Sequence, residues 1–129
     1  MNYPAFEHTE IDDLEAEEEV TFLRTRNLVS ISKTNEQLSK SVCQAIKEGH
    51  VPVVLGGDHS LAIGSVHGTA TALTNKSQIG LIWIDAHADI NTPLTSTTGN
   101  LHGQPVSFLL YELDKYLPRF KAFDWIRPW

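Results

Sequence analysis

One segment, Gly80–Asn91, carries the strongest structural signal: Gly-Leu-Ile-Trp-Ile-Asp-Ala-His-Ala-Asp-Ile-Asn. The apolar run at residues 81–84 is typical of a strand buried on both faces of a parallel sheet. Asp85, His87 and Asp89 follow at every second position, and in extended backbone this spacing directs all three side chains to one side. Two carboxylates and an imidazole at a strand end predict a divalent-metal site, with manganese or a similar ion favoured over a thiolate-bound metal.

A second apolar run at residues 51–55 predicts another buried strand, which leads into Gly-Gly-Asp-His-Ser at residues 56–60. The two glycines allow a sharp turn, and Ser60 is expected to cap a helix that ends near residue 74. The order strand, helix, strand predicts a right-handed crossover with parallel strands, and therefore an α/β fold.

This topology predicts which side chains meet. The carboxyl ends of parallel strands share one edge, and α/β proteins bind ligands in the crevice beyond that edge. His59 is therefore expected to join Asp85, His87 and Asp89 in one group of four metal ligands. Asp58, beside His59, is expected to form hydrogen bonds rather than to bind the ion directly.

Two further helices are expected. Thr34–Glu48 has Thr34 as N-cap and Gly49 at its end. Its apolar stripe is predicted to face the core and consists of Leu38, Val42, Ala45 and Ile46. The second helix begins near Pro105 and ends before Pro118.

Composition limits the possible classes of protein. The 129 residues suit a single domain, and a net charge of -6 disfavours nucleic-acid and anionic-membrane partners. Cys43 is the sole cysteine, which excludes an intrachain disulfide and a multi-cysteine zinc site and predicts a buried thiol.

Residues 1–30 are poorly patterned and acidic, and residues 21–31 are compatible with a short strand or an irregular connection. Without a targeting or membrane-spanning segment, a cytoplasmic location is expected, with the mitochondrion as the alternative.

The two strand-end motifs resemble the signatures of the ureohydrolase family. Residues 56–60 and Asp-Ala-His-Ala-Asp at 85–89 match those signatures, and residues 90–105, Ile-Asn-Thr-Pro-Leu-Thr-Ser-Thr-Thr-Gly-Asn-Leu-His-Gly-Gln-Pro, resemble arginases in particular. The resemblance implies one arginase-like domain over residues 1–129, with a three-layer α/β/α architecture and a mainly parallel sheet. It also implies two manganese ions, and hydrolysis of L-arginine to L-ornithine and urea by a hydroxide held between them.

The resemblance assigns metal-binding roles to the four strand-end residues. His59 and Asp89 would bind one ion, His87 would bind the other, and Asp85 would bridge the two. Asp89 would therefore also count as catalytic.

The loop after Asp89 receives its roles from the same resemblance. His102 matches a proton-shuttling histidine, and by itself it would be interpreted as a surface residue. Asn91, Thr98 and Asn100 match positions that bind the carboxylate end of the substrate.

One part of the family pattern is missing. The resemblance implies a later Asp-x-Asp pair and further acidic residues, whereas the acids after Asp89 are Glu112, Asp114 and Asp124. The chain is therefore expected to be a partial arginase with negligible turnover on its own. The alternatives are an agmatinase-like enzyme, or a non-catalytic subunit that associates with full-length partners or as a homo-oligomer.

The remaining histidines and tryptophans carry no site pattern. His8, His50 and His67 are expected on the surface, and Trp83 in the core.

Overall fold

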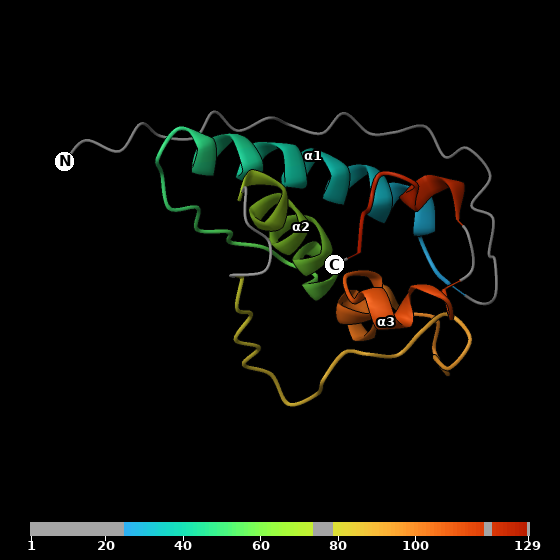
Figure 1. The fold of residues 1–129 in the computed structure, drawn as a ribbon. Coiled ribbons are helices and arrows are strands. Elements are labelled where there is room, and N and C mark those ends of the chain that lie inside the picture. Colours follow the sequence, from blue (N-terminus) through green and yellow to red (C-terminus); the bar gives the residue numbers. More distant parts are fainter. Residues whose placement is uncertain (1–24, 74–78, 118–119, 129) are drawn as a thin grey trace.

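The computed structural model describes residues 25–73, 79–117 and 120–128. Two long helices dominate the described residues, and short helical turns lie between them and after them (Figure 1). The elements are α1 (Leu28–Lys47), η2 (His59–Leu61), α2 (Ala62–Ala72), η4 (Leu101–Gly103), η5 (Pro105–Phe108), α3 (Tyr111–Asp114) and η6 (Lys121–Phe123). None of the helices in these ranges is both long and apolar enough to cross a membrane.

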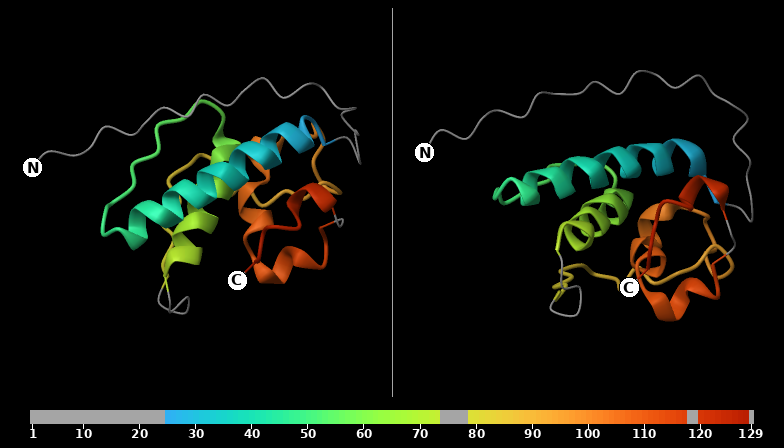
Figure 2. Two further views of the ribbon diagram at one scale, coloured as in Figure 1. Left: turned by 90° about the horizontal axis from the view of Figure 1, so that it is seen from above. Right: turned by 45° about the horizontal axis from the view of Figure 1, so that its top comes forward.

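Helix α1 packs across α2, and both views of Figure 2 show this pairing. The buried side of α1 is partly polar: Leu28, Ser32, Asn35, Ser39, Val42, Cys43 and Ala45. Two of its polar members, Asn35 and Ser39, have partners on α2. Asn35 Oδ1 accepts a hydrogen bond from Gly64 N (2.7 Å), and Ser39 Oγ lies 2.9 Å from His67 Nδ1. These bonds offset the cost of burying polar groups.

Two glycines let the helix backbones approach closely. A Cβ atom at Gly64 would overlap the carbonyl oxygen of Asn35, and one at Gly68 would overlap that of Ser39. Both glycines lie on the face of α2 that contacts α1, one helical turn apart. The crossing therefore depends on the absence of a side chain at these two positions.

The segment at residues 120–126 packs against the start of α1 and completes the hydrophobic core. Phe120, Phe123 and Ile126 pack with Leu28, and the other buried members of this cluster are Ile63, Leu101 and Phe108. Polar contacts hold the same segment. Ser32 Oγ donates to the carbonyl oxygen of Ala122 and accepts from Trp125 Nε1 at 2.9 Å.

Ser32→Ala is expected to lower the free energy of unfolding by about 1–3 kcal/mol, because the Ala122 carbonyl and the Trp125 indole lose their partner. Urea denaturation followed by far-ultraviolet circular dichroism measures the change. Ser41→Ala, at an exposed position of the same helix, should stay within about 0.5 kcal/mol of the parent. Equal effects of the two substitutions would contradict this role of Ser32.

The sequence placed the start of α1 wrongly. The helix begins at Leu28, six residues before the predicted cap Thr34. Residues 28–31, which were expected in a short strand or an irregular connection, are therefore helical. Burial of Leu28 in the core cluster favours the earlier start even though Asn27 forms no side-chain cap. The predicted end is confirmed, since Gly49 has φ +85° and its N–H donates to Ile46 O.

The predicted strands do not form within the described residues. Residues 51–55 and 79–84 have no strand pairing, and Val51, Leu55 and Ile84 are 88–93% exposed. A parallel strand is stable only when neighbouring strands satisfy its backbone and helices cover both faces. Here α1 and α2 lie along one side of each segment, and the other side is exposed.

Other predictions have mixed outcomes. The helix after residue 60 is confirmed as α2, but Asp58, rather than Ser60, caps the preceding turn. The helix expected from Pro105 is divided into η5 and α3. Cys43 is buried as expected, and His50 is exposed. His67 was predicted on the surface and is instead buried, and His8 lies outside the described residues.

Candidate metal centre

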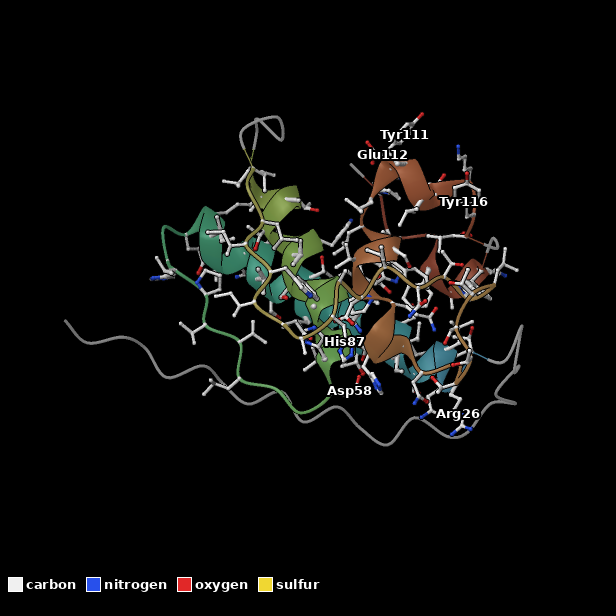
Figure 3. All side chains as sticks on the ribbon, turned by 90° about the horizontal axis from the view of Figure 1, so that it is seen from below. Arg26, Asp58, His87, Tyr111, Glu112 and Tyr116 are labelled. Carbon is white, nitrogen blue, oxygen red and sulfur yellow. The ribbon has the colours of Figure 1, made fainter. Side chains whose placement is uncertain are left out.

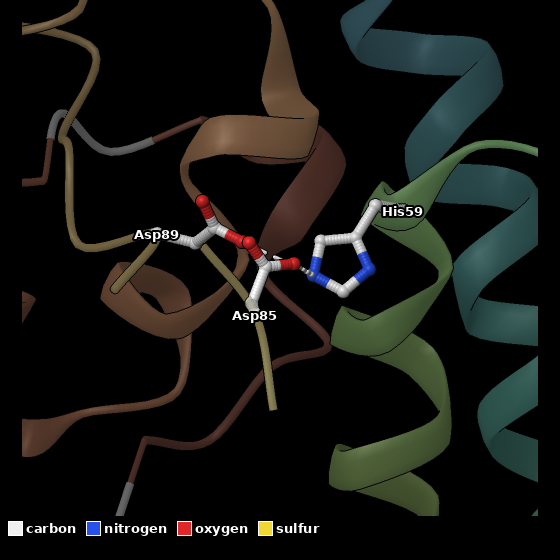
Figure 4. A group of neighbouring side chains, drawn as sticks. All are labelled: His59, Asp85 and Asp89. Carbon is white, nitrogen blue, oxygen red and sulfur yellow. Dashed lines mark ion pairs between the residues drawn. The ribbon is translucent and has the colours of Figure 1, made fainter. Parts of the chain in front are cut away.

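Three of the four predicted metal ligands converge (Figure 4). His59 Nε2 lies 3.1 Å from Asp89 Oδ2 and 3.5 Å from Asp85 Oδ2. One ligand atom from each residue lies within 4.8 Å of the other two, which leaves room for a single cation between them. One imidazole nitrogen and two carboxylate oxygens form a donor set that suits manganese or another divalent ion of similar preference.

Local structure places these side chains. Asp58 Oδ1 accepts from Ser60 N (2.9 Å) and so sets the turn that begins at His59. Asp89 adopts a left-handed φ of +50°, which aspartate tolerates better than most residues, and its carbonyl oxygen accepts from Val106 N (3.2 Å). The Asp89 side chain is only 7% exposed, whereas that of His59 is 44% exposed. The group is therefore anchored on one side and open to solvent on the other.

His87 does not join the group. Its side chain, labelled in Figure 3, is 83% exposed, and its Nδ1 lies 3.8 Å from Asp85 Oδ1. The expectation that alternate residues point one way requires extended backbone, but the chain bends at residues 85–87 and turns left-handed at Asp89. Asp85 and Asp89 still reach His59 from this conformation.

Hydrogen bonding favours the ionised forms of Asp85 and Asp58 by lowering their pKa values. The backbone N–H of His87 donates to Asp85 Oδ1 (2.9 Å), and together with His59 it holds the pKa of Asp85 below its usual range. Partial burial of Asp58 alone would raise its pKa, but hydrogen bonds from Ser60 and the nearby His102 outweigh burial and lower it. The site therefore presents negative charge to a cation at neutral pH.

His102 pairs with Asp58 at this edge. His102 Nδ1 lies 3.5 Å from Asp58 Oδ2, and both side chains are more than half exposed. The contact joins η4 to the turn that carries His59. Asp58, which the sequence predicted to form hydrogen bonds rather than to bind metal, therefore lies close to His102, the predicted proton shuttle.

The pairing predicts a pH effect. Because the folded-state pKa of Asp58 is lowered, its charge contributes stability above the usual pKa near 4, and this contribution is lost as pH falls through the folded-state value. His102→Gln is expected to move the Asp58 pKa back toward its usual range in a carbon-13 NMR titration of the side-chain carboxyl. Asp58→Asn keeps a cap for Ser60 and should remove this part of the acid dependence of unfolding. An unchanged Asp58 titration in His102→Gln would contradict the pairing.

The predicted substrate-binding residues lie on an ordered turn. Asn91 Oδ1 accepts from Thr95 Oγ1 (3.4 Å), and the hydroxyl of Thr98 accepts from Asn100 N (3.3 Å). Asn91 and Thr98 are exposed, and Asn100 is half-buried. The turn therefore presents one amide and one hydroxyl to solvent.

Sequence reasoning missed two supporting residues. Trp83 packs its ring against His59, with centroids 4.9 Å apart, although it was assigned to the core. The alternation that grouped residues 85, 87 and 89 also includes position 83, so a signal was present. Gln104 is fully buried and donates to Asn100 O (3.0 Å), and nothing in its sequence context indicated this role.

Comparison with known proteins agrees with the motifs. Residues 3–121 match the model of the Arginase family. The chain is 52% identical to human Arginase-1 over 107 residues (83% of this chain, 32% of the relative). It is also 52% identical to bovine "Arginase-2, mitochondrial" over 99 residues (77% and 27%). It thus spans about a third of the length of these relatives.

Solved structures give the same result. Arginase from Bacillus caldovelox is 46% identical, with a TM-score of 0.62 and coverage of 67% of this chain and 28% of that one. Entamoeba histolytica arginase in complex with L-ornithine is 30% identical, with a TM-score of 0.63 and coverage of 74% and 34%. These neighbours have the α/β arginase fold. Taken with the strand-end motifs, the matches show that the chain belongs to the arginase family.

Proposed function

We propose that this chain forms the part of an arginase-type hydrolase that binds divalent metal and substrate. The convergence of His59, Asp85 and Asp89 within 4.8 Å carries this proposal. In an assembly with a complete site, the reaction is hydrolysis of L-arginine to L-ornithine and urea. Family membership and the ornithine complex of the Entamoeba relative support this substrate class.

The donor set fits manganese. His59, Asp85 and Asp89 would hold the ion, and His87, which lies beside Asp85, is proposed as a ligand of the second ion of the pair. When bound, the metal supplies a nucleophile at neutral pH by lowering the pKa of water.

The chain's own residues supply orientation and proton transfer. Asp58, beside Nδ1 of His102, favours the tautomer with a proton on that nitrogen and leaves Nε2 to exchange a proton with the leaving amine. Asn91, Thr98 and Asn100 are proposed to hydrogen-bond the α-carboxylate end of the substrate. An agmatinase-like enzyme acts on a substrate without that carboxylate, so this loop favours arginine.

Metal binding and catalysis can be tested separately. The full chain is expected to bind Mn²⁺ in a calorimetric titration and to release negligible urea by itself, because three ligand atoms leave much of an octahedral shell unfilled. A fusion of the chain to the region of human Arginase-1 that follows the matched residues should hydrolyse arginine in preference to agmatine. Preference for agmatine, or sustained urea release by the chain alone, would contradict the proposal.

A further inference from the structure

A cavity of about 510 Å³ lies between α1, α2 and Trp125. This volume is within the range of pockets that hold small molecules. Its wall is mostly apolar and includes Cys43, Thr71 and Trp125, and two buried polar residues, Ser39 and His67, also line it. None of the residues that line the cavity belongs to the three-ligand cluster, so its purpose is a separate question from metal binding.

The hydrogen bonds of His67 define which of its ring nitrogens carries a proton. The main-chain N–H of Arg127 donates to Nε2 (3.3 Å), so Nε2 is an acceptor and the ring is neutral. In the neutral ring the other nitrogen, Nδ1, carries the hydrogen. Nδ1 lies 2.9 Å from Ser39 Oγ, and the imidazole therefore donates to the serine hydroxyl.

This arrangement leaves the hydroxyl proton of Ser39 without an acceptor. Ser39 is only 5% exposed, and within the described ranges its Oγ has no hydrogen-bond partner other than His67. A buried donor without an acceptor is costly, and because Ser39 lines the cavity, a group that enters the cavity can accept this proton. The pair is built for binding rather than catalysis, since a protonated Nδ1 cannot take the serine proton and activate a nucleophile.

The charged side chains of α1 that line the cavity indicate the charge of the ligand. Both acids already have donors. Lys40 Nζ lies 2.7 Å from Glu36 Oε1, and Gln44 Nε2 donates to Glu48 Oε1 (2.9 Å). The exposed amine of Lys47 has no ion-pair or hydrogen-bond partner among the residues that the structure describes. A carboxylate is the group that complements this unpaired cation.

The two unpaired donors lie at different depths in the cavity. Ser39 is buried and Lys47 is exposed, and their positions on α1 are about 12 Å apart along the helix axis. Cys43 lies between them on the same side of α1, and Trp125 adds an aromatic wall. The cavity therefore suits a ligand with an anionic outer end, an apolar body and an acceptor at its inner end.

We propose that this cavity binds a small aromatic carboxylate that carries a carbonyl group opposite its carboxylate. The carboxylate pairs with Lys47 Nζ, the ring packs against Cys43 and Trp125, and the carbonyl oxygen accepts the proton of Ser39 Oγ. The inference goes beyond the proposed function, because no step of it involves the metal centre.

The experiment titrates the full chain with 4-acetylbenzoate, without added divalent metal, and follows two-dimensional amide NMR spectra. Saturable shifts are expected at the main chain of Cys43 and Thr71 and at the Trp125 indole, with a Kd of about 1 mM or below. The Trp83 indole packs against His59 at the metal centre and should not shift.

Two analogues test the two polar ends of the ligand on the unaltered chain. In 4-isopropylbenzoate a group of similar shape replaces the acetyl group and removes the acceptor for Ser39. In 4-acetylbenzamide a neutral amide replaces the carboxylate that pairs with Lys47. Each analogue is expected to bind about 3- to 10-fold more weakly than 4-acetylbenzoate.

Variants assign each end to a residue. Lys47→Gln should weaken binding of 4-acetylbenzoate about 3- to 10-fold and leave that of 4-acetylbenzamide unchanged. Lys33→Gln alters another lysine of α1, one that does not line the cavity, and should bind as the parent does. Ser39→Ala should remove the preference for 4-acetylbenzoate over 4-isopropylbenzoate. If Ser39→Ala loses its helical circular dichroism, the analogue comparison on the parent chain still tests the hydroxyl.

Three results would overturn the inference. The first is the absence of saturable shifts at the cavity up to about 10 mM ligand, ten times the highest expected Kd. The second is equal affinity for the three compounds, or equal effects of Lys47→Gln and Lys33→Gln, which would reduce the interaction to unspecific apolar contact. The third is a set of shifts confined to Trp83 and the turn at residues 91–100, which would place the carboxylate at the candidate substrate site instead.

Discussion

His59→Ala is expected to abolish measurable Mn²⁺ binding. The substitution removes one of three ligands and leaves Asp85 and Asp89 as two close carboxylates with no imidazole between them. The loss should exceed the roughly 10–100-fold cost of removing a residue that only supports a ligand. Calorimetric titration with Mn²⁺, or the loss of the free-ion electron paramagnetic resonance signal, measures the affinity.

His50→Ala provides the matched control for this experiment. His50 is exposed and lies outside the cluster, so its loss should leave Mn²⁺ affinity unchanged. Asp89→Asn keeps the shape of a nearly buried ligand but removes its charge, and it should weaken binding as His59→Ala does. Equal affinities for the His59 and His50 variants would show that the ion binds elsewhere.

Gly68→Ala is expected to lower the free energy of unfolding by about 3 kcal/mol or more, at the upper end of what overpacking costs. The new methyl group would overlap the Ser39 carbonyl oxygen and crowd Val42. Backbone of α1 cannot rotate away as a side chain does, so the helices must separate. The gain of about 1 kcal/mol in helix propensity from Gly to Ala is too small to compensate.

Gly103→Ala is the matched control, because no atom lies within 4 Å of a Cβ at that position. Its free energy of unfolding should stay within about 0.5 kcal/mol of the parent in urea denaturation followed by circular dichroism. A stabilised Gly68→Ala variant would mean that α1 and α2 do not cross as described.

The sequence predicted most of the grouping of side chains at the candidate site. His59, Asp85 and Asp89 were grouped because strand-end motifs in an α/β chain fall at one edge, and they converge even though the strands themselves are not paired. His87 departs because its position depends on local backbone conformation, which bends at this point. Their roles as metal ligands remain predictions.

The helical layer was predicted less completely. Apolar periodicity pointed to Leu38 and Ile46 as core residues, yet both are only half-buried while Ser32, Asn35 and Ser39 are buried. A sequence pattern predicts polar residues on the surface unless the groups that form hydrogen bonds with them are known. Here the partners of Asn35 and Ser39 lie 28 or 29 residues away on another helix.

The sequence alone therefore predicted the features that depend on residue type and short spacing. These are the family, the types of the candidate metal ligands and the existence of α2. Long-range contacts settled the earlier start of α1, the glycine-dependent crossing, the burial of His67 and the pairing of Asp58 with His102. These contacts join groups that no local rule connects. The apolar segments at residues 51–55 and 79–84 show the same dependence, since an apolar run becomes a strand only when another segment supplies its hydrogen bonds and covers its exposed side.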